Sequence, residues 1–235
     1  MSDYLHIEII SLPSETTSEY NFKTVIIGEP GVGKSSIISR GVHNIFTKDY
    51  KATLFFDHSW KNYKVNNSKI RIQLWDTCGQ EVYHSVIKNF YKSALCIFLV
   101  FSINNIESFN SLSFWINEIE QSSSEDIIIF LVGNKKDIEK ERVVTEQQIN
   151  DFIHENKIKF YFETSAATGE NVDKLFEETV KQLYIKHVIP LIKNVNNVSL
   201  YSTDDNFVLS DSNKIDNDMV VIQEDNDEKC QNCVC

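Results

Sequence analysis

The sequence predicts an α/β fold, a mostly parallel six-stranded sheet with one antiparallel edge strand and helices on both faces. Short apolar runs alternate along the chain with segments of helical periodicity, which is typical of strand–helix–strand units. Several of the runs are uninterrupted, as in strands that are covered on both faces. A further pair of runs flanks Asn66 and Asn67, a dipeptide typical of a tight turn, and this hairpin supplies the antiparallel edge strand.

The elements are expected in alternation from residue 22 onward. We expect strands over residues 22–28, 54–65, 69–75, 94–101, 126–132 and 159–163. We expect helices over residues 34–46, 106–121, 145–156 and 172–187. Thr145 and Gln148 have the spacing of a capping box at the start of the third of these helices.

Composition predicts one folded domain with an appendage at each end. Residues 1–20 read as a polar extension, residues 21–190 as the domain, and residues 191–235 as an acidic tail. From Val195 onward nine acidic residues stand against two lysines, and Asn, Ser and Asp dominate. Such a segment is too polar to form a core, so we expect it to be disordered.

Charge and cysteine usage exclude several classes of protein. The net charge is −11 and no basic stripe is present, which argues against nucleic-acid binding. Five cysteines, an odd number without framework spacing, argue against a secreted disulfide scaffold and indicate a reducing compartment such as the cytosol. The sequence has neither a secretory signal nor an apolar run long enough to span a membrane.

The first motif that carries chemistry follows the first strand and opens a helix. It matches the pattern G-x-x-x-x-G-K-[ST] and comprises Gly28, Glu29, Pro30, Gly31, Val32, Gly33, Lys34 and Ser35. Its glycines let backbone N–H groups point at phosphate oxygens, next to the positive end of the helix dipole. We expect Lys34 to contact the β- and γ-phosphates and the Ser35 hydroxyl to bind Mg²⁺.

The second motif, W-D-T-C-G-Q-E, ends the hairpin. Asp76 leaves an apolar strand beside the phosphate-binding loop and is placed to join the shell of the magnesium ion. Gly79 frees a backbone N–H for the γ-phosphate, and Gln80 can orient the attacking water. The string is weak by itself and strong in this order after the phosphate-binding loop.

Two motifs at later strand ends point to guanine. In Asn134-Lys135-Lys136-Asp137, the Asp137 carboxylate can accept from the ring N1–H and the exocyclic amine of guanine, a donor pair that adenine lacks. In isolation this string could equally be a polar turn. In E-T-S-A, backbone N–H groups near Ser165 and Ala166 could meet the guanine O6.

Together these motifs, in this order, resemble the Ras superfamily over residues 22–187, and E-S-F-N-S-L-S-F-W-I-N-E-I is similar to a segment of Rab GTPases. The resemblance implies a P-loop GTPase fold that binds GTP or GDP with Mg²⁺ and hydrolyses GTP slowly, with Gln80 and Lys34 as catalytic residues. It also implies that Thr53, in the first switch region, binds magnesium through its hydroxyl and the γ-phosphate through its N–H only in the GTP state.

The chain ends in Cys233-Val234-Cys235, which resembles the doubly geranylgeranylated terminus of Rab proteins. Two lipids suit an acidic tail, because one lipid binds only marginally and the tail is repelled by anionic membranes. The alternative is that these are solvated cysteines. The resemblance implies an anchor on the cytoplasmic face of an intracellular or plasma membrane, cycling through the cytosol, and a role in vesicle trafficking.

The same resemblance implies a set of protein partners. These are an exchange factor, a GTPase-activating protein, a GDP-dissociation inhibitor, the prenylation machinery, and effectors that bind the switch regions. Trp75 falls where Rab proteins carry an aromatic cluster that faces effectors, although a tryptophan at a strand end is as often part of the core.

The chain departs from the family pattern in three places. Phe55 and His58 stand where Rab proteins carry glycine and phenylalanine, which changes the surface that effectors read. Ala167 replaces the lysine of the S-A-K motif, whose stem packs on the guanine face. Pro30 occupies the loop position nearest the γ-phosphate, and its ring fills space that an incoming arginine would use, so we expect weakened stimulation by an activating protein.

Two alternatives stay open at this point. One is a scaffold that binds GTP and a partner without useful turnover, which Pro30 and Phe55 favour, whereas the presence of Gln80, Thr53 and Ser35 favours a hydrolytic switch. The other is an ATP-handling enzyme built on the same loop, which N-K-K-D disfavours.

Overall fold

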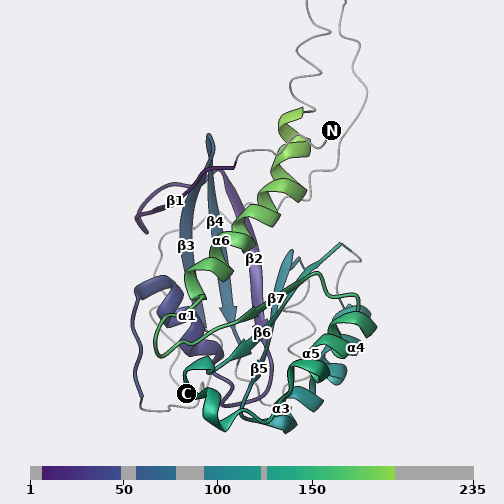
Figure 1. Ribbon diagram of the computed structural model, residues 1–235. Helices are drawn as coiled ribbons and strands as arrows, with labels where there is room; N and C mark the ends of the chain where they lie inside the picture. The colour runs from purple at the N-terminus through teal and green to yellow at the C-terminus, as the bar shows by residue number, and fades with distance from the viewer. Residues whose placement is uncertain (1–6, 49–56, 78–92, 123–125, 194–235) are drawn as a thin grey trace, which may run out of the picture. The chain divides into compact units, whose positions relative to one another are not determined.

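The computed structural model describes residues 7–48, 57–77, 93–122 and 126–193 (Figure 1). The chain divides into two units, Met1–Asn196 and Asn197–Cys235, and the described residues all belong to the first. In this described part of the chain, no helix is long and apolar enough to cross a membrane.

A seven-stranded sheet forms the centre of the first unit. Its strands are β1 (Ile9–Leu12), β2 (Tyr20–Ile27), β3 (Asp57–Val65), β4 (Ser68–Asp76), β5 (Cys96–Ser102), β6 (Ile128–Asn134) and β7 (Phe160–Glu163). They lie in the order β1-β3-β4-β2-β5-β6-β7. The neighbouring pairs β4–β2, β2–β5, β5–β6 and β6–β7 are parallel, whereas β3 runs antiparallel to both β1 and β4. The sheet is therefore mostly parallel, as the sequence predicts.

The number of strands corrects the sequence prediction of six. The additional strand, β1, lies within the segment that was expected to be a polar extension. Ile9 pairs with Val65 and packs against the core, and this contact gives the short strand its place in the sheet. Because β1 lies outside β3, the antiparallel strand is not at the edge, and β1 takes the edge position.

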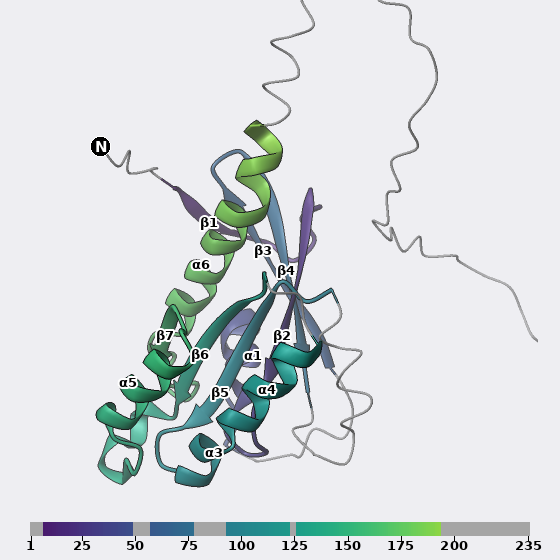
Figure 2. The same cartoon turned by 90° about the vertical axis from the view of Figure 1, so that its right-hand side faces the viewer.

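Helices cover both faces of the sheet (Figure 2). One face carries α1 (Lys34–His43) and α6 (Val172–Leu183), and the other carries α3 (Ile106–Asn110), α4 (Leu112–Ser122) and α5 (Glu146–Glu155). Strand β5 is buried along its whole length and sends alternate side chains into the two cores, for example Phe98 and Leu99. An uninterrupted apolar run is therefore what a central parallel strand requires.

The helices match the expected positions with small differences. The helix predicted over residues 106–121 is two helices that meet at Ser111, and α6 continues into a π-helical turn, η3 (Tyr184–Val188). The capping box is confirmed, since the Gln148 N–H donates to the Thr145 hydroxyl at 3.2 Å and the Thr145 N–H donates to Gln148 Oε1 at 2.9 Å.

Residues 13–19, which we call the strap, join β1 to β2 and are held by side chains of β3 and β4. The buried Asn62 amide donates to three strap carbonyls, at 2.9 Å from Pro13, 3.0 Å from Ser14 and 3.2 Å from Thr16. Arg71 donates from Nε to Asn62 Oδ1 at 2.9 Å and from Nη2 to the Thr16 carbonyl at 3.1 Å. The strap is thus fastened to the sheet by a hydrogen-bond network that the sequence did not predict.

Candidate functional site

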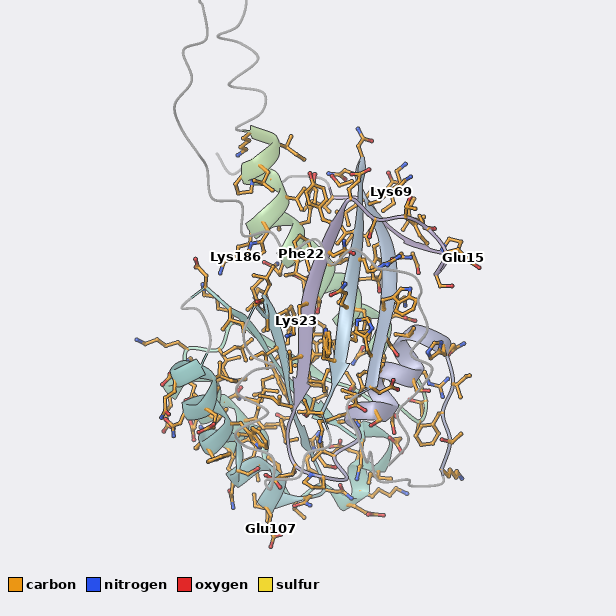
Figure 3. All side chains as sticks on the ribbon, turned by 180° about the vertical axis from the view of Figure 1, so that it is seen from behind. Glu15, Phe22, Lys23, Lys69, Glu107 and Lys186 are labelled. Atoms are coloured by element: carbon orange, nitrogen blue, oxygen red, sulfur yellow. The ribbon has the colours of Figure 1, made fainter. Side chains whose placement is uncertain are left out.

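The candidate site lies where the parallel strands end. In Figure 3 this is the end of the sheet marked by Glu107, opposite Lys69 near the tip of the β3–β4 hairpin. The loops that follow β2, β4, β6 and β7 meet there, which is where open parallel sheets place their ligand sites.

The loop between β2 and α1 has the backbone of a phosphate-binding loop. Gly28 and Gly33 have φ angles of 138° and 99°, in the region that favours glycine. A Cβ on Gly28 would lie 2.1 Å from the Val100 carbonyl oxygen, and one on Gly33 would lie 2.3 Å from Asn134 Nδ2. Both positions therefore need glycine for conformation and for close packing.

Lys34 is buried at the start of α1, and its ammonium group folds back over the loop. Nζ donates to the carbonyl oxygens of Gly28 at 2.7 Å and Glu29 at 2.9 Å. This geometry holds a positive charge at the mouth of a helix N-terminus, where an anion is stabilised. The Glu29 carboxylate makes a contact elsewhere: its Oε1 accepts a hydrogen bond from Trp115 Nε1 at 3.4 Å.

Ser35 and Asp76 come together beside this charge. The Ser35 hydroxyl donates to Asp76 Oδ2. Among the described residues the other carboxylate oxygen, Oδ1, has no hydrogen-bond partner although Asp76 is only 3% exposed. Burial raises the pKa of Asp76, while the Ser35 hydrogen bond and Lys34 lower it. A buried oxygen without a donor is costly for the chain alone and is the kind of oxygen that a hard cation binds.

Asn134, at the end of β6, ties the phosphate-binding loop to the loop after β7. Its Nδ2 donates to the Val32 carbonyl at 2.8 Å. Its Oδ1 accepts from the Thr164 hydroxyl at 3.2 Å and from the Ala166 N–H at 3.3 Å. The two motifs that the sequence analysis assigned to phosphate and to guanine are therefore in direct contact.

Asp137 and Ser165 form the other contact at this end. The Ser165 hydroxyl, fully buried, donates to Asp137 Oδ1 at 2.6 Å and also accepts from the Thr168 N–H at 3.0 Å. Lys135 adopts a φ of 70°, and burial lowers its pKa although Asp137 raises it. The carboxylate is thus oriented by a serine that is itself held by the backbone.

A cavity of about 500 Å³ joins these parts. It is lined by the phosphate-binding residues Pro30, Gly31, Gly33, Lys34 and Ser35, and by Asn134, Lys135, Asp137, Ala166 and Ala167 of the guanine motifs. This volume is that of a small-molecule or cofactor site. The structure therefore brings the two groups of motifs together around one cavity.

The sequence profile of the Ras family matches residues 23–185. The chain belongs to the Ras family of small GTPases. Members of this family bind and hydrolyse GTP, so the chain is a GTPase.

Rab proteins are among the relatives of this GTPase. It is 39% identical over 173 residues to Ras-related protein Rab-11C of Dictyostelium discoideum, an alignment that covers 74% of this chain and 77% of that protein. It is 34% identical over 191 residues to GTP-binding protein ypt3 of Schizosaccharomyces pombe, with 81% and 85% covered. It is 39% identical over 158 residues to human Ras-related protein Rab-30, with 67% and 77% covered.

Several residues predicted for the site of this GTPase are placed away from the cavity lining. Gly28, Glu29, Val32, Asp76 and Ser165 stand behind the lining and support it through the contacts given above. Thr53, Gly79 and Gln80, and the terminal cysteines Cys233 and Cys235, lie outside the described residues, as does Phe55.

Other residues line the cavity without having been predicted. They are Ser36, Ser39, Ile45, Phe46, Thr47, Lys48 and Thr77. Phe46 has the clearest signal, since it is an aromatic residue in a polar stretch that follows the helix after the phosphate-binding loop. An aromatic ring at a cavity wall can pack on a planar base, and the sequence analysis assigned Phe46 only to the helix.

Three of the residues that depart from the Rab pattern are described, and Ala167 is the one already named in the cavity lining. Pro30 is exposed and lines the cavity at its phosphate end. His58 lies opposite Trp75 in the β3–β4 pairing, with ring centroids 4.8 Å apart, and Trp60 lies 5.7 Å from His58. The histidine therefore takes part in an aromatic cluster next to the strand end that carries Asp76.

Proposed function

We propose that the chain is a Rab-type switch that binds GTP or GDP with Mg²⁺, hydrolyses GTP through a water oriented by Gln80, and acts in vesicle trafficking. The single observation that carries the proposal is the cavity, which has the phosphate-binding loop at one part and the N-K-K-D and E-T-S-A segments at another. A guanine nucleotide would occupy both parts at once, with its phosphates at the first part and its base at the second.

The phosphate end binds through charge and backbone. Backbone N–H groups of residues 28–35, with the exception of Pro30, which has none, and the N-terminus of α1 face the phosphates, and Lys34 contacts the β- and γ-phosphates. Its present hydrogen bonds to two loop carbonyls hold the ammonium group in the loop before the ligand arrives.

The residues present fit magnesium. Ser35 supplies a hydroxyl and Asp76 a carboxylate, both hard oxygen ligands, and Thr53 would add a second hydroxyl. The support for this assignment is Asp76 Oδ1, which is buried and has no hydrogen-bond partner among the residues that the structure describes. When bound, the ion neutralises charge on the β- and γ-phosphate oxygens.

The base end selects guanine. Asp137 accepts from N1–H and the exocyclic amine, and Ser165 fixes the carboxylate for that purpose. Asn134 and Ala166 hold the two loops together, the Lys135 side chain and Phe46 contribute walls, and the backbone near Ser165 and Ala166 meets O6.

Hydrolysis and switching involve residues outside the described part. Gln80 orients the attacking water, and the N–H groups of Gly79 and Thr53 contact the γ-phosphate. Loss of that phosphate releases both segments, which is a change that partners can read. Without an arginine supplied from within the chain, the intrinsic rate should be on the order of 10⁻⁴ to 10⁻³ s⁻¹.

The anchor and the partners follow from the Rab relationship. Residues 21–190, together with strand β1 and the strap, form the switch domain, and residues 191–235 carry it on the cytoplasmic face of a membrane through prenyl groups on Cys233 and Cys235. The partners are an exchange factor, an activating protein, a GDP-dissociation inhibitor, the prenylation machinery and effectors. Pro30 would weaken stimulation by the activating protein, and Pro30→Ser would restore it.

Two variants test the proposal. Gln80→Leu should leave GTP binding intact and abolish single-turnover GTP loss at saturating Mg²⁺, because the water loses its orienting group. Asp137→Asn should move the preference from guanine toward xanthine nucleotides, because the amide donates where the carboxylate accepted. If Asp137→Asn left the preference for guanine over xanthine nucleotides unchanged, the proposed role of Asp137 in recognising the base would be refuted.

A further inference from the structure

Arg40 is a charged residue of α1 that connects two distant parts of the chain. Its Nε donates to the Ala166 carbonyl at 2.9 Å and its Nη2 donates to the Ala167 carbonyl at 2.8 Å. Helix α1 begins at the phosphate-binding loop, whereas Ala166 and Ala167 belong to the guanine end. One side chain therefore fastens the base loop to the helix that carries the phosphate-binding residues.

The same guanidinium holds a third segment. Nη1 donates to Asn44 Oδ1 at 2.9 Å and to the Asn44 carbonyl at 3.3 Å. Asn44 ends α1 with a left-handed φ of 54° and turns the chain into residues 45–48, all of which line the cavity. Arg40 thus sets the position of the cavity wall that includes Phe46.

Arginine is suited to this role by geometry. Its planar group presents five N–H donors in a fixed fork, so it can serve two neighbouring carbonyls and a side chain at once. A lysine at this position would offer one point charge on a flexible stem and could not match the three directions. Arg40 does not itself line the cavity, so it acts on the ligand through these segments.

The base loop has a particular need for such an anchor. Position 167 carries alanine, so the loop has no long side chain of its own at this point of the cavity lining. On the cavity side the loop is held by the Ser165 hydroxyl bond to Asp137 Oδ1 at 2.6 Å and by the Ala166 N–H bond to Asn134 Oδ1 at 3.3 Å. The two bonds from Arg40 hold the carbonyl groups of Ala166 and Ala167 from a different element, α1.

We propose that Arg40 is the positioning residue of the guanine end of the cavity. It holds the Ala166–Ala167 backbone and residues 45–48 in the geometry that retains the base, and it contributes nothing to the chemistry at the γ-phosphate. The inference rests on the proposed function, because it assigns this end of the cavity to guanine.

The test compares Arg40→Lys and Arg40→Gln with a matched arginine, Arg71→Lys, which lies in the strap network. The measurements are the dissociation rate of a fluorescent GDP analogue and the single-turnover hydrolysis rate constant at saturating GTP. Both Arg40 variants should release GDP at least about tenfold faster, a size typical of partners that orient ligand-binding groups. Their hydrolysis rate constants at saturation should stay within about twofold of the wild type, since no group at the γ-phosphate is altered.

A rescue separates positioning from loss of folding. Adding Ala167→Lys to Arg40→Gln should recover GDP retention, because a lysine stem on the base replaces the anchor that was removed. Dissociation rates equal to the wild type in both Arg40 variants would overturn the inference, as would a hydrolysis rate constant that falls in step with affinity. If the wild type itself bound no guanine nucleotide, the proposed function would fail instead.

Discussion

Two buried asparagines, Asn62 and Asn134, each join separate segments of backbone, and the regions around them differ. Asn62 is 2% exposed in the middle of β3 and Asn134 is 1% exposed at the end of β6. Each donates from its amide nitrogen to a loop carbonyl and accepts at its amide oxygen. By burial and hydrogen bonding alone the two would be judged alike.

Their surroundings separate them. Around Asn62 the strap fills the space, and the amide is occupied by three carbonyls and by Arg71. Around Asn134 the hydrogen bonds hold two loops at the wall of a cavity, and Asp76, which binds Ser35 of the same lining, keeps a buried oxygen without a described partner. A buried polar network marks a ligand site only where the chain leaves space and unsatisfied groups beside it.

The largest effect is expected when the network at the cavity is broken. Asn134→Ala removes the tie to Val32 and leaves the Ala166 N–H without its acceptor, so both loops should shift. We expect GDP to dissociate about 100-fold faster, in line with the sensitivity of bound ligands to small displacements of positioning groups. A stopped-flow measurement with a fluorescent GDP analogue gives this rate, and a change below about threefold would contradict the assignment of Asn134 to the site.

The next effect is on stability and concerns the strap. Asn62→Ala removes the amide donor that three strap carbonyls share and the acceptor of Arg71 Nε, and should lower the free energy of unfolding by about 2 to 3 kcal/mol. GDP dissociation should remain within about twofold of the wild type, because the network is far from the cavity. Urea unfolding of the nucleotide-loaded protein measures the first quantity.

A second substitution at the same position sharpens this result. Asn62→Asp keeps an acceptor for Arg71 and places a carboxylate against the strap carbonyls, so it should destabilise the protein at least as much as Asn62→Ala. Equal stability of the wild type and both variants would show that the strap is not held by Asn62.

The smallest effect is on the pH dependence of stability and concerns His58 of β3. Burial lowers the pKa of His58 below its ordinary value of 6.5 and Arg71 lowers it further, while Asp57 raises it. As the pH falls, His58 is therefore protonated in the unfolded chain before it is protonated in the folded chain. The contribution of neutral His58 to the free energy of unfolding is complete above pH 6.5 and is lost as the pH drops toward the lower pKa that His58 has in the folded state.

His58→Phe should therefore reduce the fall in unfolding temperature between about pH 7.5 and about pH 5.5. The reduction should be partial, because burial also lowers the pKa of His187. Thermal unfolding at the two pH values checks this, and an identical fall in the wild type and the variant would exclude His58 as a contributor.

Local patterns in the sequence were sufficient to predict much of the fold and to name candidate residues for the site. The uninterrupted run at β5 and the capping box of Thr145 each depend on residues close to one another in the chain, and the structure confirms both. The phosphate and guanine motifs are also short strings, and residues of each line the cavity, where their roles stay predictions. These features are readable because strand burial, helix capping and loop geometry each impose a short-range pattern.

The remaining features depend on distant partners. Asn62 is up to 49 positions in the sequence from the strap residues that it binds, and Arg40 is 126 positions from Ala166. Neither contact leaves a local pattern in the sequence. Strand β1 is four residues long, and its place at the edge depends on the pairing with β3. A lone asparagine in a strand or an arginine on a helix has no periodicity that distinguishes it from a solvated residue.

The central claim is that the cavity holds a guanine nucleotide, and the most direct measurement is the identity and amount of nucleotide released from the purified chain on denaturation. Chromatography of the supernatant should show GDP or GTP at about one molecule per chain, given the slow release typical of this class of site. Adenine nucleotide, or a chain that neither carries nor takes up guanine nucleotide in the presence of Mg²⁺, would contradict the account.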